Sequence, residues 1–431
     1  MSQGATAAQT LIPLWRHPRF TPYWIGYTVS QFGDRITELA LPLIAVLTLS
    51  AGASQTGVLT AVIWAPNLLA LLAGSWVERS THKKAVLIAA DVLRAVVLVS
   101  LPIGYWLGVV TFTQLLLNAL LSGVGQVFFS TAYPPFFVRL VPRSQYLEAN
   151  SRINGSRSAS YVAGPALGGL LIQVLTAPIA VLIDSASFLV SAGMIGYVRI
   201  PAMPVERPEG SIWRNAVAGL RFVVHSRYLR PGLSCFATVN FFNFITTALV
   251  VLFAARSLHL SAAVIGLAFG VGALGGILGA ILSTRCSRRF GVGTMIAVGA
   301  VLFPLPSSAL AFAGGPRPLC AVVLSAVEFV SSLGVMFLDI NYSSLQATVI
   351  PDALRSRVSG AFTTINYGVR PLGALTGAVL GSWLGLRPTL LIAGIGGALS
   401  VLWLLPSPIR RVHSLDDLEP GDAVIGQDVV G

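Results

Sequence analysis

Runs of about twenty apolar residues recur along this chain, and they restrict its fold more than any other feature. Leu59 to Val77 and Ile179 to Val198 are two such runs, and a helix of this length crosses the hydrocarbon core of a bilayer. Charged residues make up only 10% of the 431 residues, whereas a soluble domain carries about 25%. A soluble fold of this length could not cover its surface, so the sequence indicates a protein that lipid solvates.

The apolar runs predict an all-α integral membrane protein with twelve transmembrane helices in two pseudo-symmetric six-helix bundles. The helices are expected at 22–48, 56–77, 85–107, 113–138, 147–173, 178–199, 232–255, 261–284, 292–313, 318–347, 354–383 and 388–405. The N-terminal bundle would occupy 22–200 and the C-terminal bundle 231–405. Between them, 201–230 has the pattern of a cytoplasmic linker with an amphipathic helix. Residues 1–21 and 406–431 are expected to form cytoplasmic tails.

The two halves of the sequence look like copies of one another. The segment AYPPFFVRLVP, which ends at Pro142, matches NYSSLQATVIP, which ends at Pro351. These two segments are 209 positions apart, and Pro165 and Pro371 are 206 positions apart. Two parallel copies of a six-helix bundle are typical of transporters that bind their substrate near the midplane between the copies.

Positive charge is distributed unevenly among the predicted loops. The net charge is +12, which in a soluble protein would favour nucleic acid as a partner. Lys and Arg gather on one side, at Arg16, Arg19, Arg79, Lys83, Lys84, Arg139, Arg143, Arg285, Arg288, Arg289, Arg355, Arg357, Arg410 and Arg411, whereas Arg256, Arg317 and Arg387 fall on the other. By the positive-inside rule both termini are cytoplasmic. The basicity thus indicates topology and contact with membrane lipids, and no nucleic-acid partner is expected.

Enzymes, cofactors and metal sites find no support in the sequence. Gly270, Gly272 and Gly275 spell a dinucleotide-binding pattern, but they lie within an apolar run and are expected to pack helices together. Cys235, Cys286 and Cys320 have no paired spacing, so neither a disulfide framework nor a zinc site is expected. No phosphate-binding loop is present, and we predict a protein that is not an enzyme.

Acidic residues inside the predicted helices are the candidates for a mechanism, because a charge at the bilayer centre costs about 3 kcal/mol or more. They are Asp34, Glu38, Asp91, Asp184, Glu328 and Asp339, and Arg370 is a further candidate for a charge in a cavity. Asp34 and Glu38 share a helical face, and Arg35 could neutralise Asp34. Asp91 precedes Arg94 by three residues, which predicts a structural intrahelical pair. The alternative for each acid is a salt bridge or polar contact between helices.

One loop motif links the chain to a known family. Gly74, Glu78, Arg79, Lys83 and Lys84 follow the second predicted helix, where a small residue lets a neighbouring helix approach closely. This motif resembles the signature of the major facilitator superfamily, with Glu78 in place of the usual Asp. The resemblance implies a cytoplasmic gate that favours the outward-facing state, with a partner near 352–357. The alternative is an ordinary basic loop.

A second motif lies in the fifth predicted helix. Gly155, Gly164, Pro165, Gly168 and Gly169 have the spacing of the superfamily's antiporter signature. Proline removes a backbone hydrogen bond and glycine permits close packing, so this helix could act as a hinge. A role in packing alone is the alternative. The resemblance implies an exporter.

Shorter phrases narrow the resemblance to one branch of the superfamily. ADVLRA at Ala90, VLIDSASFLVSA at Val181 and IPDALRSRVSG at Ile350 resemble the drug:proton antiporter branch that contains macrolide and enterobactin exporters. In the superfamily, helices 1, 4, 7 and 10 line the central cavity. That favours Asp34 and Glu328 as proton carriers, while Asp184, on a peripheral helix, is interpreted as structural. Aromatic residues suited to such a cavity are Phe32, Trp64, Tyr133, Phe241, Phe242 and Tyr342.

These observations predict a multi-pass transporter of the bacterial cytoplasmic membrane that exports a small amphipathic drug or metabolite in exchange for protons. A monomer without cofactor is expected. Alternatives within transport are export of a siderophore or another self-made metabolite, and movement of lipid. Outside transport, a membrane receptor or scaffold would bind a ligand without moving it.

Overall fold

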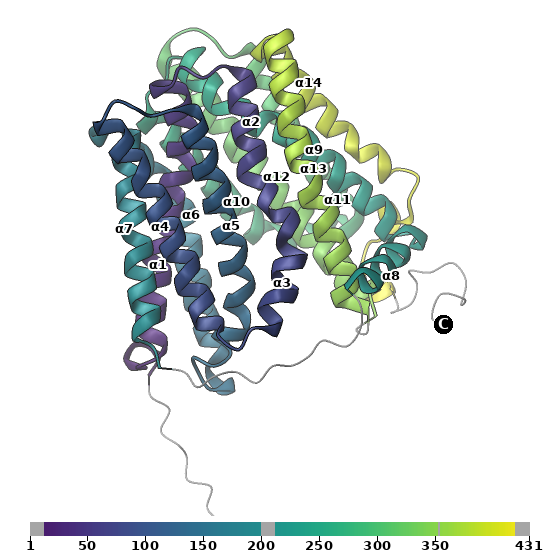
Figure 1. Ribbon diagram of the computed structural model, residues 1–431. Helices are drawn as coiled ribbons and strands as arrows, with labels where there is room; N and C mark the ends of the chain where they lie inside the picture. The colour runs from purple at the N-terminus through teal and green to yellow at the C-terminus, as the bar shows by residue number, and fades with distance from the viewer. Residues whose placement is uncertain (1–12, 200–211, 352–353, 419–431) are drawn as a thin grey trace, which may run out of the picture.

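The computed structural model describes residues 13–199, 212–351 and 354–418, and the elements in these ranges are helices (Figure 1). The first half contains α1 (Phe20–Leu43), α2 (Ala53–Trp64), α3 (Ala70–Arg79), α4 (Lys83–Trp106), α5 (Phe112–Phe137), α6 (Tyr146–Leu175) and α7 (Ala177–Tyr197). After α8 (Ile212–His225), the second half contains α9 (Leu229–Arg256), α10 (Ala262–Phe290), α11 (Val292–Leu302), α12 (Arg317–Val349), α13 (Arg355–Trp383) and α14 (Leu386–Ala398). The prediction of an all-α membrane protein is confirmed.

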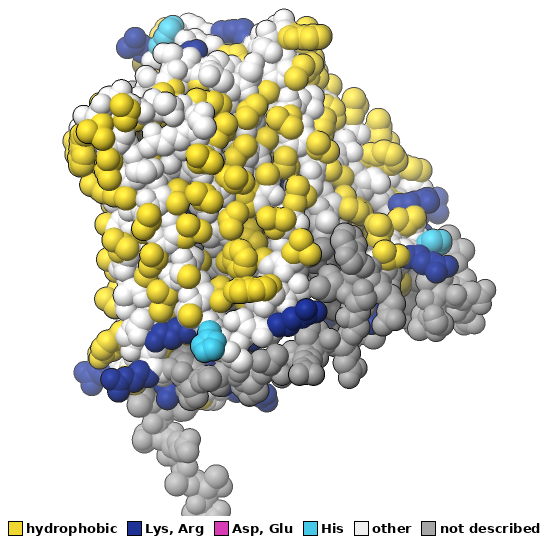
Figure 2. Space-filling view, in the orientation of Figure 1, with side chains coloured by type: hydrophobic (Ala, Val, Ile, Leu, Met, Phe, Trp, Pro, Cys, Tyr) yellow, Lys and Arg dark blue, Asp and Glu magenta, His cyan; other side chains and the backbone are white. Residues whose placement is uncertain are grey.

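Nine spans in the described ranges are long and apolar enough to cross a membrane. Three further predicted spans lie beside them. The first, α1, carries Asp34, Arg35 and Glu38; the second is divided between α2 and α3; and α13 carries Arg370. Figure 2 shows apolar side chains over the middle of one face and dark blue basic side chains toward its two ends, the pattern expected for a surface that faces lipid.

Proline accounts for several boundaries that differ from the prediction. The second span is broken by a 3₁₀ turn at Ala65–Leu69, which contains Pro66, and the span expected at 292–313 continues past Pro304 as a 3₁₀ helix, Leu305–Phe312. In the first span, Pro42 precedes a π turn at Ile44–Thr48. Because proline donates no backbone hydrogen bond, the regular α ladder cannot continue through it unchanged.

The two halves meet along two seams built from small residues, α6 against α10 and α2 against α13. A Cβ on Gly169 would collide with the carbonyl oxygen of Ala262, and a Cβ on Gly57 would collide with Ala378. Both contacts lie toward the end of the bundle opposite the basic loops. Small residues at these positions therefore let helices of opposite halves approach closely there.

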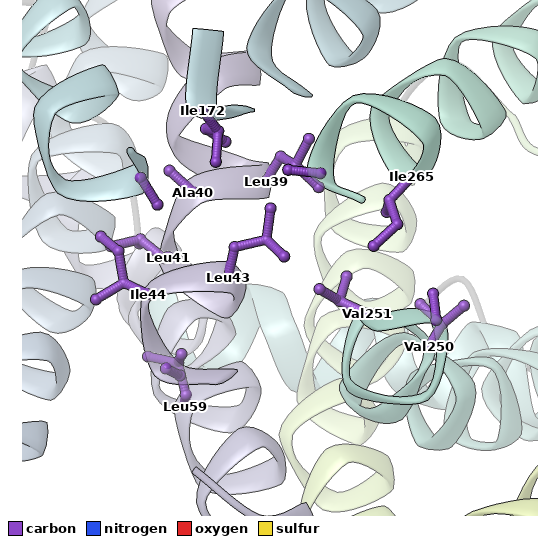
Figure 3. Packing of buried hydrophobic residues seen from close by; sticks show 14 of the residues in the cluster. Leu39, Ala40, Leu41, Leu43, Ile44, Leu59, Ile172, Val250, Val251 and Ile265 are labelled. Atoms are coloured by element: carbon purple, nitrogen blue, oxygen red, sulfur yellow. The ribbon is translucent and has the colours of Figure 1, made fainter. Parts of the chain in front are cut away.

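Buried apolar side chains join the halves at the same end. One core cluster takes Leu43 from α1, Ile172 from α6, Val251 from α9 and Ile265 from α10 (Figure 3). Arg256 also donates a hydrogen bond across the halves to the carbonyl oxygen of Val46, at 3.3 Å. At the opposite end, α3 packs against α5 of its own half. The described contacts thus close one end of the interface between the halves.

The glycines of the dinucleotide-like pattern lie between helices, as predicted. Gly270 faces Val162 of α6, whereas Gly272 and Gly275 face Glu328 and Phe329 of α12. No strand accompanies them in the described residues, so they pack helices together.

A helix forms within the segment predicted to be a linker. In α8, Phe222 and Val223 are buried, whereas Arg221 and His225 are exposed. A Cβ on Gly219 would collide with the carbonyl oxygen of Arg357, so α8 lies directly against the start of α13. Residues 200–211 fall outside the described range.

Close packing at the seam between α6 and α10 predicts that a larger side chain there lowers stability. Gly169→Val should lower the melting temperature in detergent, because the added atoms have no room beside Ala262 and overpacking costs about 1–3 kcal/mol. Gly155→Val is the matched control: it lies in the same helix, and a Cβ there meets no atom within 4 Å. Equal melting temperatures for the two variants would contradict close packing at the seam.

Candidate functional site

A charge cluster lies among α1, α4 and α7, which pack side by side in the first half (Figure 1). Arg94 of α4 forms a salt bridge with Asp34 of α1. The guanidinium of Arg94 also lies over the ring of Phe188 of α7, 3.8 Å from its centroid. One buried arginine thus connects three helices.

The predicted pair between Asp91 and Arg94 is not formed. Arg94 binds Asp34 instead, and Asp91 lies beside Ser191 of α7. Within the described part of the chain, Oδ2 of Asp91 accepts no hydrogen bond. The three-residue spacing on α4 therefore did not predict the partner of Arg94, because the carboxylate of Asp34 on α1 lies closer to the guanidinium.

Asp184 of α7 belongs to the same cluster. Its side chain is fully buried and accepts hydrogen bonds from Thr37 of α1 and, at 3.0 Å, from Ser187. A Cβ on Gly33 would collide with its Oδ1, so the glycine leaves room for the carboxyl group. The sequence predicts a peripheral, structural position for Asp184, whereas the structure places its carboxyl group against Thr37 of α1.

Glu38 and Arg35 form a separate pair on α1. The distance between Nη1 of Arg35 and Oε2 of Glu38 is 2.6 Å, and 58% of the Glu38 side chain is exposed. The guanidinium of Arg35 lies 4.2 Å from the ring centroid of Tyr161 of α6. Arg35 therefore pairs with Glu38, and Arg94 is the cation that pairs with Asp34.

Glu328 of α12 is half-buried next to Gly272 of α10. Among the described residues it has no ion pair and no hydrogen-bond partner. It does not line the cavity found in the second half.

That cavity has a volume of about 250 Å³ and lies among α9, α12 and α13. It is lined by Phe236, Asn240, Asn243, Phe244, Phe303, Val335, Leu338, Asp339, Asn366 and Arg370. The sequence predicted Arg370 as a cavity charge, and the structure places it in this wall. The sequence predicted Asp339 only as one of several acids inside the helices, and it did not single out the neighbouring Asn243 and Asn366 as residues of the site. Polar residues at three- and four-residue spacing in apolar helices, such as Asn240 with Asn243 and Asn366 with Arg370, were the available signal.

Arg370 is surrounded by aromatic rings. Its guanidinium carbon lies 3.9 Å from the ring centroid of Tyr367, 4.5 Å from that of Trp64 and 5.2 Å from that of Phe244. Trp64 belongs to α2, so the first half contributes to this site. Asp339 acts electrostatically on Arg370, but the described residues include no ion pair between them. The two opposite charges thus face one cavity without contacting each other.

Four of the other predicted aromatics have packing contacts within one half. Tyr133 stacks on Tyr23 and Tyr27, and Tyr342 lies against Phe236. Phe242 fills the space beside Gly396. Phe241 meets Phe242 edge to face, and Phe32 is half-buried.

Two of the predicted gate residues, Lys84 and Gly74, contact their own half. Lys84 donates hydrogen bonds to the carbonyl oxygens of Gly196, at 2.7 Å, and Val198, at 2.8 Å. Gly74 faces Thr131 of α5, and Arg79 is exposed. Lys83 is half-buried at the start of α4. The side chain of Glu78 and residues 352–353 lie outside what the structure describes, so the gate stays a prediction.

The predicted hinge packs α6 against two other helices. Gly164 accommodates the side chain of Arg35, and Gly168 lies against Ile36. A Cβ on Gly266 of α10 would collide with the carbonyl oxygen of Pro165. The motif therefore joins α1 to the seam with the second half. Its action as a hinge stays a prediction.

Known proteins place this geometry in context. The chain is 27% identical over 405 residues to the multidrug efflux pump Tap of Mycolicibacterium fortuitum, covering 89% of this chain and 94% of that protein. It is 24% identical over 412 residues to the enterobactin exporter EntS of Citrobacter koseri, covering 92% of this chain and 93% of that protein. An inward-facing bacterial homologue of the iron transporter ferroportin shares the fold, with a TM-score of 0.70, 16% identity, and coverage of 91% of this chain and 100% of that chain.

The family match covers most of the sequence, from residue 23 to residue 374. It includes the charge cluster, the seam between α6 and α10 and the arginine of the cavity. The chain is a membrane transporter that belongs to the Major Facilitator Superfamily.

Proposed function

We propose that this protein exports a small amphipathic compound from the cytoplasm of a bacterium and is driven by proton influx. The observation that carries the proposal is the cavity with Asp339 and Arg370 in its wall and Trp64 beside it. Opposite charges that line one cavity without pairing offer binding groups for a polar substrate, while the aromatic rings suit its apolar part. The monomeric state expected from the sequence remains part of the proposal.

The closed outer end of the interface supports loading of the cavity from the cytoplasm. The seams at Gly57 and Gly169 close the end opposite the basic loops, and the positive-inside rule puts those loops and both termini in the cytoplasm. The cavity would then be loaded from the cytoplasm, as an exporter requires. Relatives named as an efflux pump and an exporter support the same direction.

Proton coupling is proposed for acids within the membrane helices, and first for those of the first half. Asp34 is 12% exposed and holds Arg94 across the interface between α1 and α4. Breaking or forming that pair changes the contact between two helices, which is what a coupling site must do. Glu328, the other predicted carrier, stays in the proposal because it is half-buried without an ionic partner among the described residues.

Dye efflux tests the direction and the energy source. Cells that overproduce the protein should expel an amphipathic fluorescent dye, and a protonophore should stop the expulsion because it removes the driving gradient. Reconstituted vesicles should accumulate the dye only when an imposed pH gradient has the matching sign. Passage that ignores the gradient would contradict proton coupling.

Replacing the cavity arginine tests the substrate site. Arg370→Gln should abolish efflux while the protein still inserts, because an amide cannot replace the guanidinium within the aromatic rings. Arg387→Gln is the matched control, since Arg387 bonds the carbonyl oxygen of Ala311 at 2.7 Å, away from the cavity. Efflux by Arg370→Gln equal to that of the control would remove the cavity from the proposal.

Export of a siderophore is a second candidate, and the enterobactin exporter among the relatives favours it. Competition tests whether the two kinds of compound use one site. Enterobactin that inhibits dye efflux in vesicles would indicate a shared site, and unchanged dye efflux would remove this second candidate.

A further inference from the structure

Two buried carboxyl groups, those of Asp91 and Asp184, and the partly buried carboxyl group of Asp34 lie around one buried guanidinium in the first half. Asp34 is 12% exposed, Asp91 1%, Asp184 0% and Arg94 8%. Only Asp34 and Arg94 form an ion pair among the described members of this cluster. Burying an unpaired charge is far more costly than burying a neutral acid. One guanidinium neutralises one carboxylate, so the cluster is electrically neutral when Asp91 and Asp184 each carry a proton.

We propose that Asp184 is the residue that binds and releases the coupling proton. This inference rests on the proposed proton-driven export. Of the two acids without an ionic partner in the described chain, Asp184 contacts α1, through Thr37, whereas Asp91 lies beside Ser191 of α7. A change of charge on Asp184 is therefore felt across the interface between α7 and α1.

The charged and titratable groups around Asp184 come from two helices. Asp34 of α1 and Arg94 of α4 act on it electrostatically, and the hydroxyls of Thr37 and Ser187 complete its surroundings. Asp91 lies three residues from Arg94 on α4. Arg35 of α1 is engaged with Glu38 and Tyr161. In the described part of α6, no charged group acts on Asp184.

Release of the proton supplies a switch. The protonated carboxyl of Asp184 loses its proton and becomes a carboxylate, which then competes with Asp34 for Arg94. Arg94 is placed for this change, because its guanidinium already lies over Phe188, one turn along α7 from Asp184. Its buried Nε also lacks a hydrogen-bond partner in the described structure. A second position of Arg94 could satisfy that group.

The movement has a path to the interface between the halves. When Arg94 leaves Asp34, α1 loses its ion pair with α4. The same stretch of α1 supports the hinge motif, since Gly164 and Gly168 lie against Arg35 and Ile36. The next residue of that motif, Gly169, lies in the seam with α10. Protonation of Asp184 is thus linked through α1 to the contact that closes one end of the transporter.

Two transport assays separate coupling from binding. Asp184→Asn retains the size of the acid and fixes a neutral side chain. In vesicles, this variant should lose dye accumulation driven by a pH gradient, yet retain exchange of dye for dye without a gradient, because exchange needs no net proton movement. Glu148→Gln is the matched control: Glu148 forms an exposed pair with Arg152 at 3.0 Å, and both activities should stay at the wild-type level.

The outcomes are distinct. Accumulation by Asp184→Asn at the wild-type rate overturns the inference. Loss of accumulation in Asp91→Asn with normal accumulation in Asp184→Asn also overturns it and assigns the proton to Asp91. If the wild type itself ignores the pH gradient, the proposed function fails first, and the variants are then uninformative about export but still testable by spectroscopy.

Infrared spectroscopy provides that second test and does not depend on transport. The wild type at neutral pH should show the carbonyl band of a protonated carboxylic acid, and the Asp184 contribution to that band should disappear in Asp184→Asn. Should this variant fail to fold, Thr37→Val removes a hydrogen bond from the carboxyl group and should shift the band. A band that neither substitution alters would overturn the inference.

Discussion

Hydrocarbon cannot solvate charge, and this constraint determines where the charged side chains of the protein lie. Arg94 is buried because Asp34 neutralises it and the ring of Phe188 covers it. Arg370 is held in the second half by aromatic rings from both halves. Each half therefore contains an arginine whose position depends on side chains from neighbouring helices. The lipid-facing surface is left to apolar residues, as Figure 2 shows for one face.

The sequence predicted most of the fold because the bilayer imposes a length and a composition on each span. The apolar runs gave the positions of the helices within a few residues, and the departures occur where Pro66 and Pro304 interrupt the ladder. The antiporter-like glycines were predicted as a group, and Gly169 lies where only a small side chain fits. What could not be predicted is which face of each helix meets which neighbour.

Because the sequence does not show which helix faces meet, it did not predict the partners of the buried acids. Asp91 and Arg94 are close in sequence, yet Arg94 binds Asp34 because α1 and α4 both pack against α7. Asp184 looked peripheral because its helix is an outer one, but its side chain points to Thr37 of α1. The cavity shows the same limit, since Asp339 and Arg370 come together only when α12 and α13 both border α9.

The two charge sites differ in a way that fits separate tasks. The cluster around Arg94 is buried, lies within one half and contains more acids than its arginine can neutralise, so protons are the natural ligand. The site around Arg370 borders a cavity of about 250 Å³ and has one acid, one base and several amides, which can bind a larger polar group. Trp64 joins that site from the first half. In the proposed mechanism, a movement of α1 that tilts the two halves at the seam between α6 and α10 also moves Trp64 of the first half relative to Arg370 of the second. A proton in one half then changes the affinity for substrate in the other without the two ligands meeting.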